Sequence, residues 1–236
     1  QKPHGVLWQV PWGKHFPAGM RHKHNATQYK RYNHTAVLPI VVVRDPYTWM
    51  QSMCRESYNA HFAHNKSLCP NIMPYQHDIR GYARYGKLKY MPVNVAYMED
   101  YKVKYRSLAH MWNDWYREYL RTADFPRIVV RLEDLVFHGR YVIQKICECV
   151  DFKFMPYGRF VHTSNSANQN KGIDLSDSEN GLLNSIIKYG NSTTRRLNYP
   201  NFQLRAAQEA LDKDLMSFFH YKYEPLADHD HVNEHA

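Results

Sequence analysis

The sequence predicts an α/β fold. Residues 38–43 form an apolar, β-branched run that ends at Arg-Asp-Pro and continues as a helix-like segment, and residues 127–131 form a second short apolar strand between helix-like segments. In α/β proteins, a strand that stops at a charged residue and continues as a helix places that charge at the carboxyl edge of the sheet, where ligands bind. We therefore expect an anion-binding site around Arg44.

The segment from Arg44 to Ser52 offers two ligands for a phosphate. Arg44 has a planar, permanently charged guanidinium, and Ser52 lies eight residues further on, two turns into the expected helix, where its hydroxyl can reach the same anion. The plainer interpretation is a strand-turn-helix in which Arg44 pairs with Asp45 or with a helix C-terminus.

Arg-Asp-Pro followed by a serine at this distance closely resembles the 3′-phosphate-binding segment of sulfotransferases that use 3′-phosphoadenosine 5′-phosphosulfate (PAPS). The resemblance implies that Arg44 and Ser52 hold the 3′-phosphate of PAPS and of its desulfated product, PAP. It also implies a three-layer α/β fold with a central, mostly parallel sheet flanked by helices, as in the P-loop nucleotide-binding folds.

Residues 8–17 read WQVPWGKHFP, a short apolar strand followed by a glycine and Lys-His-x-Pro. This is similar to the Lys-Thr-His-Leu-Pro of cytosolic sulfotransferases, with one residue fewer between lysine and histidine. The resemblance makes His15 the base that takes the acceptor's proton, a step that needs a group titrating near neutrality. Lys14 would neutralise the charge that develops on the bridging oxygen. Because the chain has 15 histidines, a surface or structural role is the alternative for His15.

Helix-like segments flank the second strand. Residues 105–121 place large side chains along one helical face, and we expect this stripe to belong to the core. After the strand, Leu-Glu-Asp-Leu and a helix-like segment at 141–150 resemble the Tyr-Glu-Asp-Leu region of sulfotransferases. Leu132 replaces the tyrosine that can stack on adenine, so adenine must be recognised elsewhere or more loosely. Glu133 and Asp134 are expected to cap the next helix rather than to act in catalysis.

The C-terminal third predicts a loop, a helix and a tail. Residues 163–172 form a polar, turn-rich loop whose Lys171 and Gly172 resemble the basic loop that closes over the 3′-phosphate in cytosolic sulfotransferases. A plain solvent-exposed loop is the alternative. Residues 201–221 are expected to form one final helix that packs on the sheet. In the tail, residues 228–236, histidines alternate with acids, and we expect it to fray and to bind no metal.

Composition is consistent with one domain over residues 1–227. A chain of 236 residues that is 44% hydrophobic can bury one sizeable core, and it contains no apolar run of membrane-spanning length. The net charge of +9 indicates anionic partners, such as a nucleotide or a sulfated glycan, and no motif for specific nucleic-acid binding is present. The basic residues 21–32 form a solvated loop or a patch that gathers an acidic acceptor. The oligomeric state is not predicted.

Cysteines and glycosylation sequons indicate the compartment. Asn-x-Ser/Thr triplets occur at Asn25, Asn33, Asn65 and Asn191. Cys54 and Cys69 flank a polar, His-rich segment and predict a disulfide, whereas Cys147 and Cys149 lie too close together on a helix to bridge. We therefore expect the Golgi lumen or another part of the secretory pathway, with any membrane anchor outside this chain. A cytoplasmic protein with free thiols is the alternative.

One expected element is missing. Sulfotransferases begin with a strand and a lysine-bearing loop that wraps the 5′-phosphosulfate, and nothing before Trp8 can supply it, so we expect the chain to be a piece of a longer protein. The predicted function is transfer of the sulfuryl group from PAPS to a hydroxyl or amine, of which a carbohydrate is one candidate, without a metal. The alternative is a non-catalytic, sulfotransferase-like module that binds a polyanion through a basic cleft. A nucleotide kinase would need a Walker motif that the sequence lacks.

Overall fold

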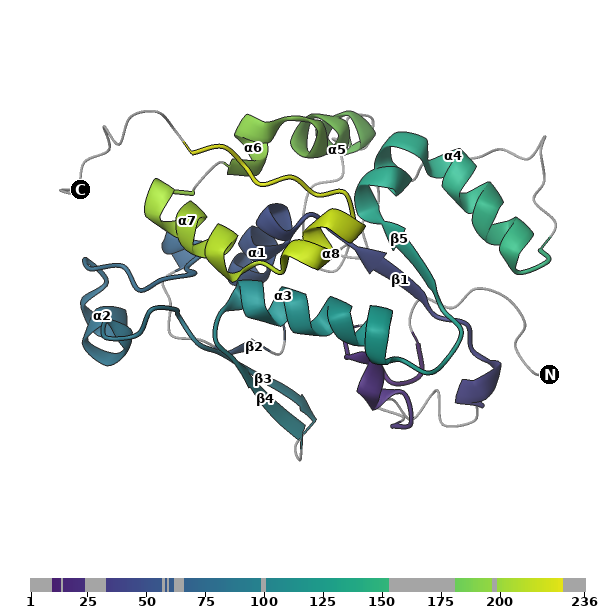
Figure 1. Ribbon diagram of the computed structural model, residues 1–236, viewed down its shortest axis with the longest axis horizontal. Coiled ribbons are helices and arrows are strands. Elements are labelled where there is room, and N and C mark those ends of the chain that lie inside the picture. The colour runs from purple at the N-terminus through teal and green to yellow at the C-terminus, as the bar shows by residue number, and fades with distance from the viewer. Residues whose placement is uncertain are drawn as a thin grey trace. The chain divides into compact units, whose positions relative to one another are not determined.

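The computed structural model is an α/β protein with a small parallel sheet, an antiparallel sheet and helices (Figure 1). The residues that the structure describes are 10–13, 15–23, 33–56, 58, 60–61, 66–98, 101–152, 181–196 and 199–226. The chain divides into two compact units. The first comprises Gln1–Val41, Pro46–Ile128 and Asn198–Ala236, and the second Val42–Asp45 and Val129–Leu197.

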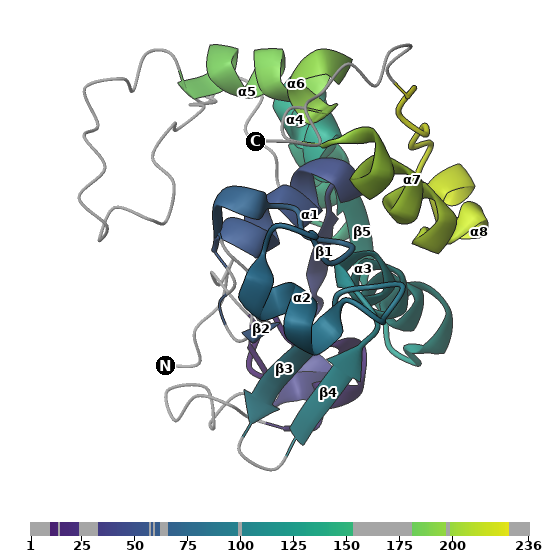
Figure 2. The same cartoon turned by 90° about the vertical axis from the view of Figure 1, so that its left-hand side faces the viewer.

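The first unit contains a three-stranded antiparallel sheet. Its strands are β2 (Ala60–His61), β3 (Val93–Met98) and β4 (Tyr101–Tyr105), paired in the order β2-β3-β4. Figure 2 shows β3 and β4 side by side. Because successive side chains of a strand point to opposite faces, the alternating sequence leaves one face buried and the other, with Lys102 and Lys104, exposed to solvent.

Helices surround the core of the first unit. They are α1 (Pro46–Arg55), α2 (Ile79–Tyr85), α3 (Leu108–Arg117), α7 (Asn201–Ala210) and α8 (Lys213–Phe218), with 3-10 turns η1 (Ala18–Met20), η3 (His34–Ala36) and η4 (Lys66–Leu68). Ser107 caps α3 by accepting the His110 N–H, and a π-helical turn, η5 (Glu118–Thr122), follows α3 directly. Most of the predicted aromatic stripe is buried, including Trp112, which confirms its place in the core.

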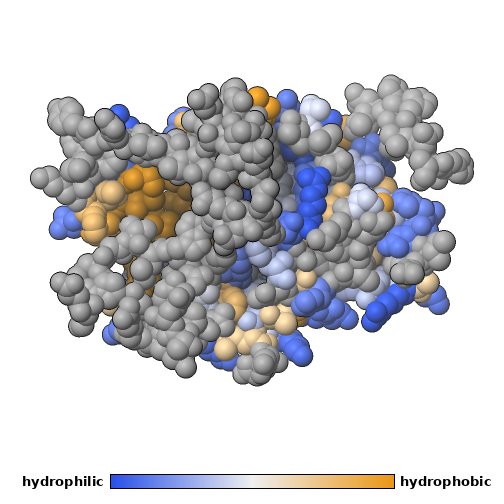
Figure 3. Space-filling view, turned by 180° about the vertical axis from the view of Figure 1, so that it is seen from behind, coloured by the Kyte–Doolittle hydropathy of each residue, from blue (hydrophilic) through white to orange (hydrophobic). Residues whose placement is uncertain are grey.

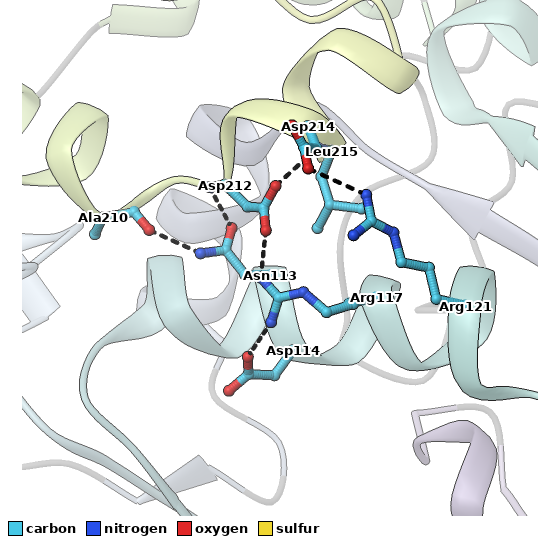
Figure 4. A network of polar contacts seen from close by, with 8 residues as sticks. All are labelled: Asn113, Asp114, Arg117, Arg121, Ala210, Asp212, Asp214 and Leu215. Carbon is cyan, nitrogen blue, oxygen red and sulfur yellow. Dashed lines mark hydrogen bonds and ion pairs between the residues drawn. The ribbon is translucent and has the colours of Figure 1, made fainter.

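The C-terminal helix is interrupted. A single helix over residues 201–221 was predicted, but α7 ends at Ala210, Leu211 is extended, and Asp212 caps α8 by accepting the Leu215 N–H at 3.0 Å. Figure 4 shows why the break is stable. Asn113 of α3 donates to the Ala210 carbonyl at 2.7 Å and accepts the Asp212 N–H at 3.0 Å.

Ion pairs from α3 and from η5, which follows it, reinforce the same junction. Arg117 bridges Asp114 and Asp212, and Arg121 pairs with Asp214 at 3.3 Å (Figure 4). Burial raises the pKa of Asp212, but the hydrogen bonds from Arg117 and from backbone N–H groups outweigh it and hold the pKa below its usual value. The prediction of one helix was wrong because these contacts come from α3, about 100 residues earlier, and not from the local sequence.

In the described residues of the second unit lie the ends of two parallel strands and three helices. β1 (Ile40–Val43) and β5 (Ile128–Arg131) pair as a two-stranded sheet, and their carboxyl halves belong to this unit. The helices are α4 (Leu132–Cys149), α5 (Gly181–Gly190) and α6 (Ser192–Arg196); α4 contacts α5, and α5 contacts α6.

The structure shows which face of β1 is buried, and it corrects the predicted start of α4. Val41 and Val43 are buried, whereas Ile40 and Val42 are each 42% exposed. The helix expected at 141–150 begins at Leu132, immediately after β5, and kinks at His138. Leu-Glu-Asp-Leu is therefore the first turn of a helix and not a connection.

Apolar residues also reach the surface. On the face drawn in Figure 3, orange apolar residues lie among blue hydrophilic ones in the described part of the molecule. Apolar surface of this kind is normal for a folded protein. Of the helices among the described residues, none has the length and apolar character needed to span a membrane.

Candidate functional site

The chain leading to His15 makes a tight turn. The Gly13 N–H donates to the Val10 carbonyl at 3.0 Å, and the Phe16 N–H donates to the Gly13 carbonyl at 3.2 Å. Gly13 has φ +117, and a Cβ there would lie 3.1 Å from the Phe16 ring, so only glycine fits this turn without strain. The strand predicted over residues 8–12 is therefore wrong for its described part, residues 10–12.

The π-helical turn η5 fixes this segment in place. The hydroxyl of Tyr119 accepts the Trp12 indole N–H at 3.2 Å and donates to the Phe16 carbonyl at 2.9 Å, so it binds the chain on both sides of His15. Glu118 accepts the Gly19 N–H, where any Cβ would collide with the Glu118 carboxylate. Trp12 and Phe16 are buried, and burial raises the pKa of Tyr119 to about 12, which keeps its hydroxyl protonated as a donor.

The side chain of His15 is exposed on this fixed backbone. Its ring lies 4.5 Å from the ring of Tyr58, centroid to centroid, and Tyr58 is itself 51% exposed with φ +48. A rigid backbone with an accessible imidazole is what a general base needs, because the proton acceptor must meet the substrate in a defined position.

Ser52 and the disulfide lie at the end of α1. Ser52 is half-buried in the second turn of α1, and its carbonyl accepts the Glu56 N–H at 2.8 Å. The predicted disulfide between Cys54 and Cys69 is confirmed, with the two Cα atoms 5.5 Å apart and both residues buried. Cys147 and Cys149 carry free thiols, as expected from their spacing on a helix.

The first residue of the basic segment 21–32 does not contribute to a surface patch. Arg21 is buried, its guanidinium lies 4.2 Å from the centroid of the Phe125 ring, and it donates to the His34 carbonyl at 3.2 Å. Such a stacked cation stabilises the fold and is not free to gather an acceptor. Lys23, by contrast, is exposed over the ring of Tyr101.

Arg44 follows the last residue of β1 in the second unit. Its guanidinium lies 5.4 Å from the centroid of the Tyr189 ring, on α5. Burial raises the pKa of Tyr189, and the positive charge of Arg44 reduces this shift without reversing it. The backbone N–H of Asp45 donates to Glu133 at 3.0 Å, so the first turn of α4 is hydrogen-bonded to the chain directly after Arg44.

A second arginine stands at the end of the neighbouring parallel strand. Arg131 is the last residue of β5, and its Nε donates to Asp134 at 2.8 Å in a bidentate ion pair. Asp134 therefore neutralises Arg131, and Arg131 itself occupies the N-cap position of α4. Arg131 was not predicted as a site residue, although an arginine stands at the end of the apolar run in both strands.

Some of the predicted site residues lie in the described part of the structure, and others lie outside it. His15 and Ser52 belong to the first unit and Arg44 to the second. Lys14, Lys171 and Gly172 lie outside the described residues, as do the loop at 163–172 and the tail at 228–236. Within the described ranges, no three His, Cys, Asp or Glu side chains are grouped so as to hold a metal ion.

Comparisons with models of protein families, with curated proteins and with solved structures found no match to this chain. Any functional assignment therefore depends on the residues themselves. Tyr119, Tyr58 and Tyr189 were not predicted as site residues, because each acquires its importance from a contact with a segment distant in the sequence.

Replacing Tyr119 with phenylalanine tests the support of the His15 segment. Tyr119→Phe removes both hydrogen bonds of the hydroxyl and leaves the buried Trp12 N–H and Phe16 carbonyl unpaired, so the free energy of unfolding should fall by about 1–3 kcal/mol. Urea denaturation measures this loss. The exposed Tyr82 provides the matched control, since Tyr82→Phe should change stability by less than about 0.5 kcal/mol. Equal effects of the two substitutions would show that the hydroxyl of Tyr119 contributes nothing.

Proposed function

We propose that this chain is the catalytic part of a PAPS-dependent sulfotransferase that transfers the sulfuryl group to a hydroxyl or amine. The observation that carries the proposal is the local structure around Arg44. β1 ends one residue before Arg44, α1 begins two residues after it, and Ser52 lies in the second turn of α1. A strand that ends at a cation and continues into a helix is the arrangement that α/β proteins use to bind anionic ligands.

The proposal includes the finer architecture. In it, β1 and β5 belong to a central, mostly parallel sheet flanked by helices in three layers, and residues 1–227 form one sulfotransferase-like domain. The cation of Arg44, directly after β1, is consistent with an edge that attracts anions, whereas the charge of Arg131 is neutralised by Asp134.

The proposed reaction is a direct displacement at sulfur. The acceptor oxygen or nitrogen forms a bond to sulfur, the bond from sulfur to the bridging oxygen breaks, PAP leaves, and the acceptor's proton passes to His15. Lys14 neutralises the charge that develops on the bridging oxygen. Arg44 and Ser52, with Lys171 and Gly172 of the loop, hold the 3′-phosphate. No metal is needed for these steps.

The compartment follows from the same proposal. We infer passage through the secretory pathway, to the Golgi lumen, because Cys54 and Cys69 form a disulfide and because the Asn33 sequon is exposed. The carboxamide oxygen of Asn33 accepts both the N–H of Thr35, at 3.0 Å, and its hydroxyl, at 2.7 Å. Material secreted from eukaryotic cells should lose mass on glycosidase treatment. Unmodified sequons together with four reduced cysteines would favour a cytoplasmic protein.

A non-catalytic polyanion-binding module is the second candidate. Its support is the net charge of +9 and the exposed lysines of β4. A crystal structure with PAP separates the two functions. The sulfotransferase proposal predicts the 3′-phosphate within hydrogen-bond distance of Arg44 and Ser52. PAP bound away from both residues would refute this assignment and leave the polyanion module.

A further inference from the structure

The solvent face of the antiparallel sheet carries a group of cations on a rigid support. The strand register places Lys104 opposite Asn94, and Asn94 opposite His61, so these three exposed side chains form a row across β4, β3 and β2. Lys102 stands opposite Ala96 on the same face. We call His61, Asn94, Ala96, Lys102 and Lys104 the basic sheet face.

The other side of the same strands is anchored in the core. Val93, Val95 and Tyr105 are buried, and Tyr105 exchanges a hydrogen bond of 3.1 Å with the buried Tyr97. A surface whose backbone is fixed by core packing loses little conformational entropy when a ligand binds to it. The basic sheet face is therefore organised before any partner arrives.

Among the residues that the structure describes, no ion pair neutralises the charge of this face. Lys102 and Lys104 stand opposite neutral residues, and among the described residues neither lysine forms an ion pair, whereas Lys89 pairs with Glu209 and Lys145 with Glu148. Together with a net charge of +9, two unpaired ammonium groups at adjacent outward positions create a local positive potential. Such a potential attracts an anion.

The geometry favours an extended anion. Outward residues of one strand are about 6.8 Å apart and neighbouring strands about 4.8 Å apart, so the donors of the basic sheet face extend both along and across the strands. Ammonium, amide and imidazole groups all donate to sulfate, carboxylate and hydroxyl oxygens. None of the five residues is Phe, Tyr or Trp, so the face offers no platform for stacked bases, which argues against single-stranded nucleic acid.

We propose that the basic sheet face binds an acidic polysaccharide chain. Binding of the polysaccharide does not depend on the proposed reaction. The polysaccharide would also be the acceptor of the sulfuryl group, and this assignment rests on the proposed sulfotransferase function. Lysines on an edge strand such as β4 also protect against strand pairing between molecules. That role by itself predicts no affinity for a polysaccharide, so a binding measurement distinguishes the two.

Heparin serves as the probe for the test. The double variant Lys102→Gln, Lys104→Gln is compared with Lys213→Gln, Lys222→Gln, which removes two exposed lysines from α8 and the segment after it and has the same net charge. The first variant should lose at least about tenfold in affinity for heparin, with a salt slope smaller by about 2, and the control should change little. Unchanged melting temperatures verify that both variants fold.

Several results would overturn the inference. They are no binding of heparin by the unmodified protein, equal losses in the two double variants, or tighter binding of a single-stranded oligonucleotide with the same dependence on Lys102 and Lys104. Stabilisation by PAP is measured on the same proteins. If the Lys102, Lys104 double variant loses affinity for heparin and is still stabilised by PAP, the basic sheet face is a site separate from the PAP site. If heparin binds through these lysines but PAP does not stabilise the unmodified protein, the proposed sulfotransferase function is refuted and the polysaccharide site is retained.

Discussion

Replacing His15 with alanine is expected to lower kcat for sulfuryl transfer by about 10²–10⁴-fold, as for the loss of a general base. The affinity for PAP should change little, because His15 acts on the acceptor and not on the 3′-phosphate. The turn at Gly13 and the two hydrogen bonds of Tyr119 hold the backbone on both sides of His15, so the substitution removes the imidazole without removing the support of its segment.

The measurement needs a form of the protein that carries a phosphosulfate loop, and an acceptor that it uses. Steady-state kinetics give kcat, and calorimetry gives the affinity for PAP. His77→Ala, which removes another exposed histidine, is the matched control and should retain full activity. If His15→Ala kept nearly full turnover, the base would be a different residue, and Glu133 would be the next candidate.

Removing the disulfide should have the largest effect on stability. Cys54→Ala with Cys69→Ala opens a link between residues 15 apart in sequence and should lower the free energy of unfolding by about 3 kcal/mol in the chain-entropy model. The link joins α1 to a segment that is also held from α7. There Gln203 accepts the N–H groups of Ile72, at 2.7 Å, and Met73, at 3.0 Å.

Urea denaturation without reductant measures the loss. The free cysteines provide the control, because Cys147→Ser with Cys149→Ser removes two thiols from α4 without breaking any bond. This control should change the free energy of unfolding by less than about 1 kcal/mol. A similar stability for the unmodified protein and the Cys54, Cys69 double variant would show that the disulfide does not constrain the unfolded chain.

The elements that the sequence predicts well are those set by local patterns. The strand before Arg44 is a run of β-branched residues, α3 has a strong helical stripe, and Cys54 and Cys69 flank a short polar segment. In each case the residues that decide the structure lie within about two turns or one loop of one another. The phosphate-binding role of Arg44 remains a prediction, since its local structure is only one of the conditions that such a site requires.

The elements that the sequence does not predict depend on distant contacts. The break at Leu211 requires Asn113, and the support of His15 requires Tyr119, which is 103 residues from Phe16. Good helix formers on both sides of Leu211 conceal the break, and a tyrosine in an aromatic stripe is indistinguishable from any other core residue. The pairing of Arg131 with Asp134 is local and could have been noticed, because β5 ends in arginine as β1 is followed by one.

The assignment of Arg44 to the 3′-phosphate is tested most directly by thermal unfolding with PAP and with AMP. PAP should raise the melting temperature, and AMP, which lacks the 3′-phosphate, should raise it far less. Arg44→Ala should abolish this difference, because a hydrogen bond to a charged group contributes about 1.5–3 kcal/mol. Arg55→Ala, at the exposed end of α1, should preserve it. Equal shifts with PAP and AMP in the unmodified protein would contradict the assignment.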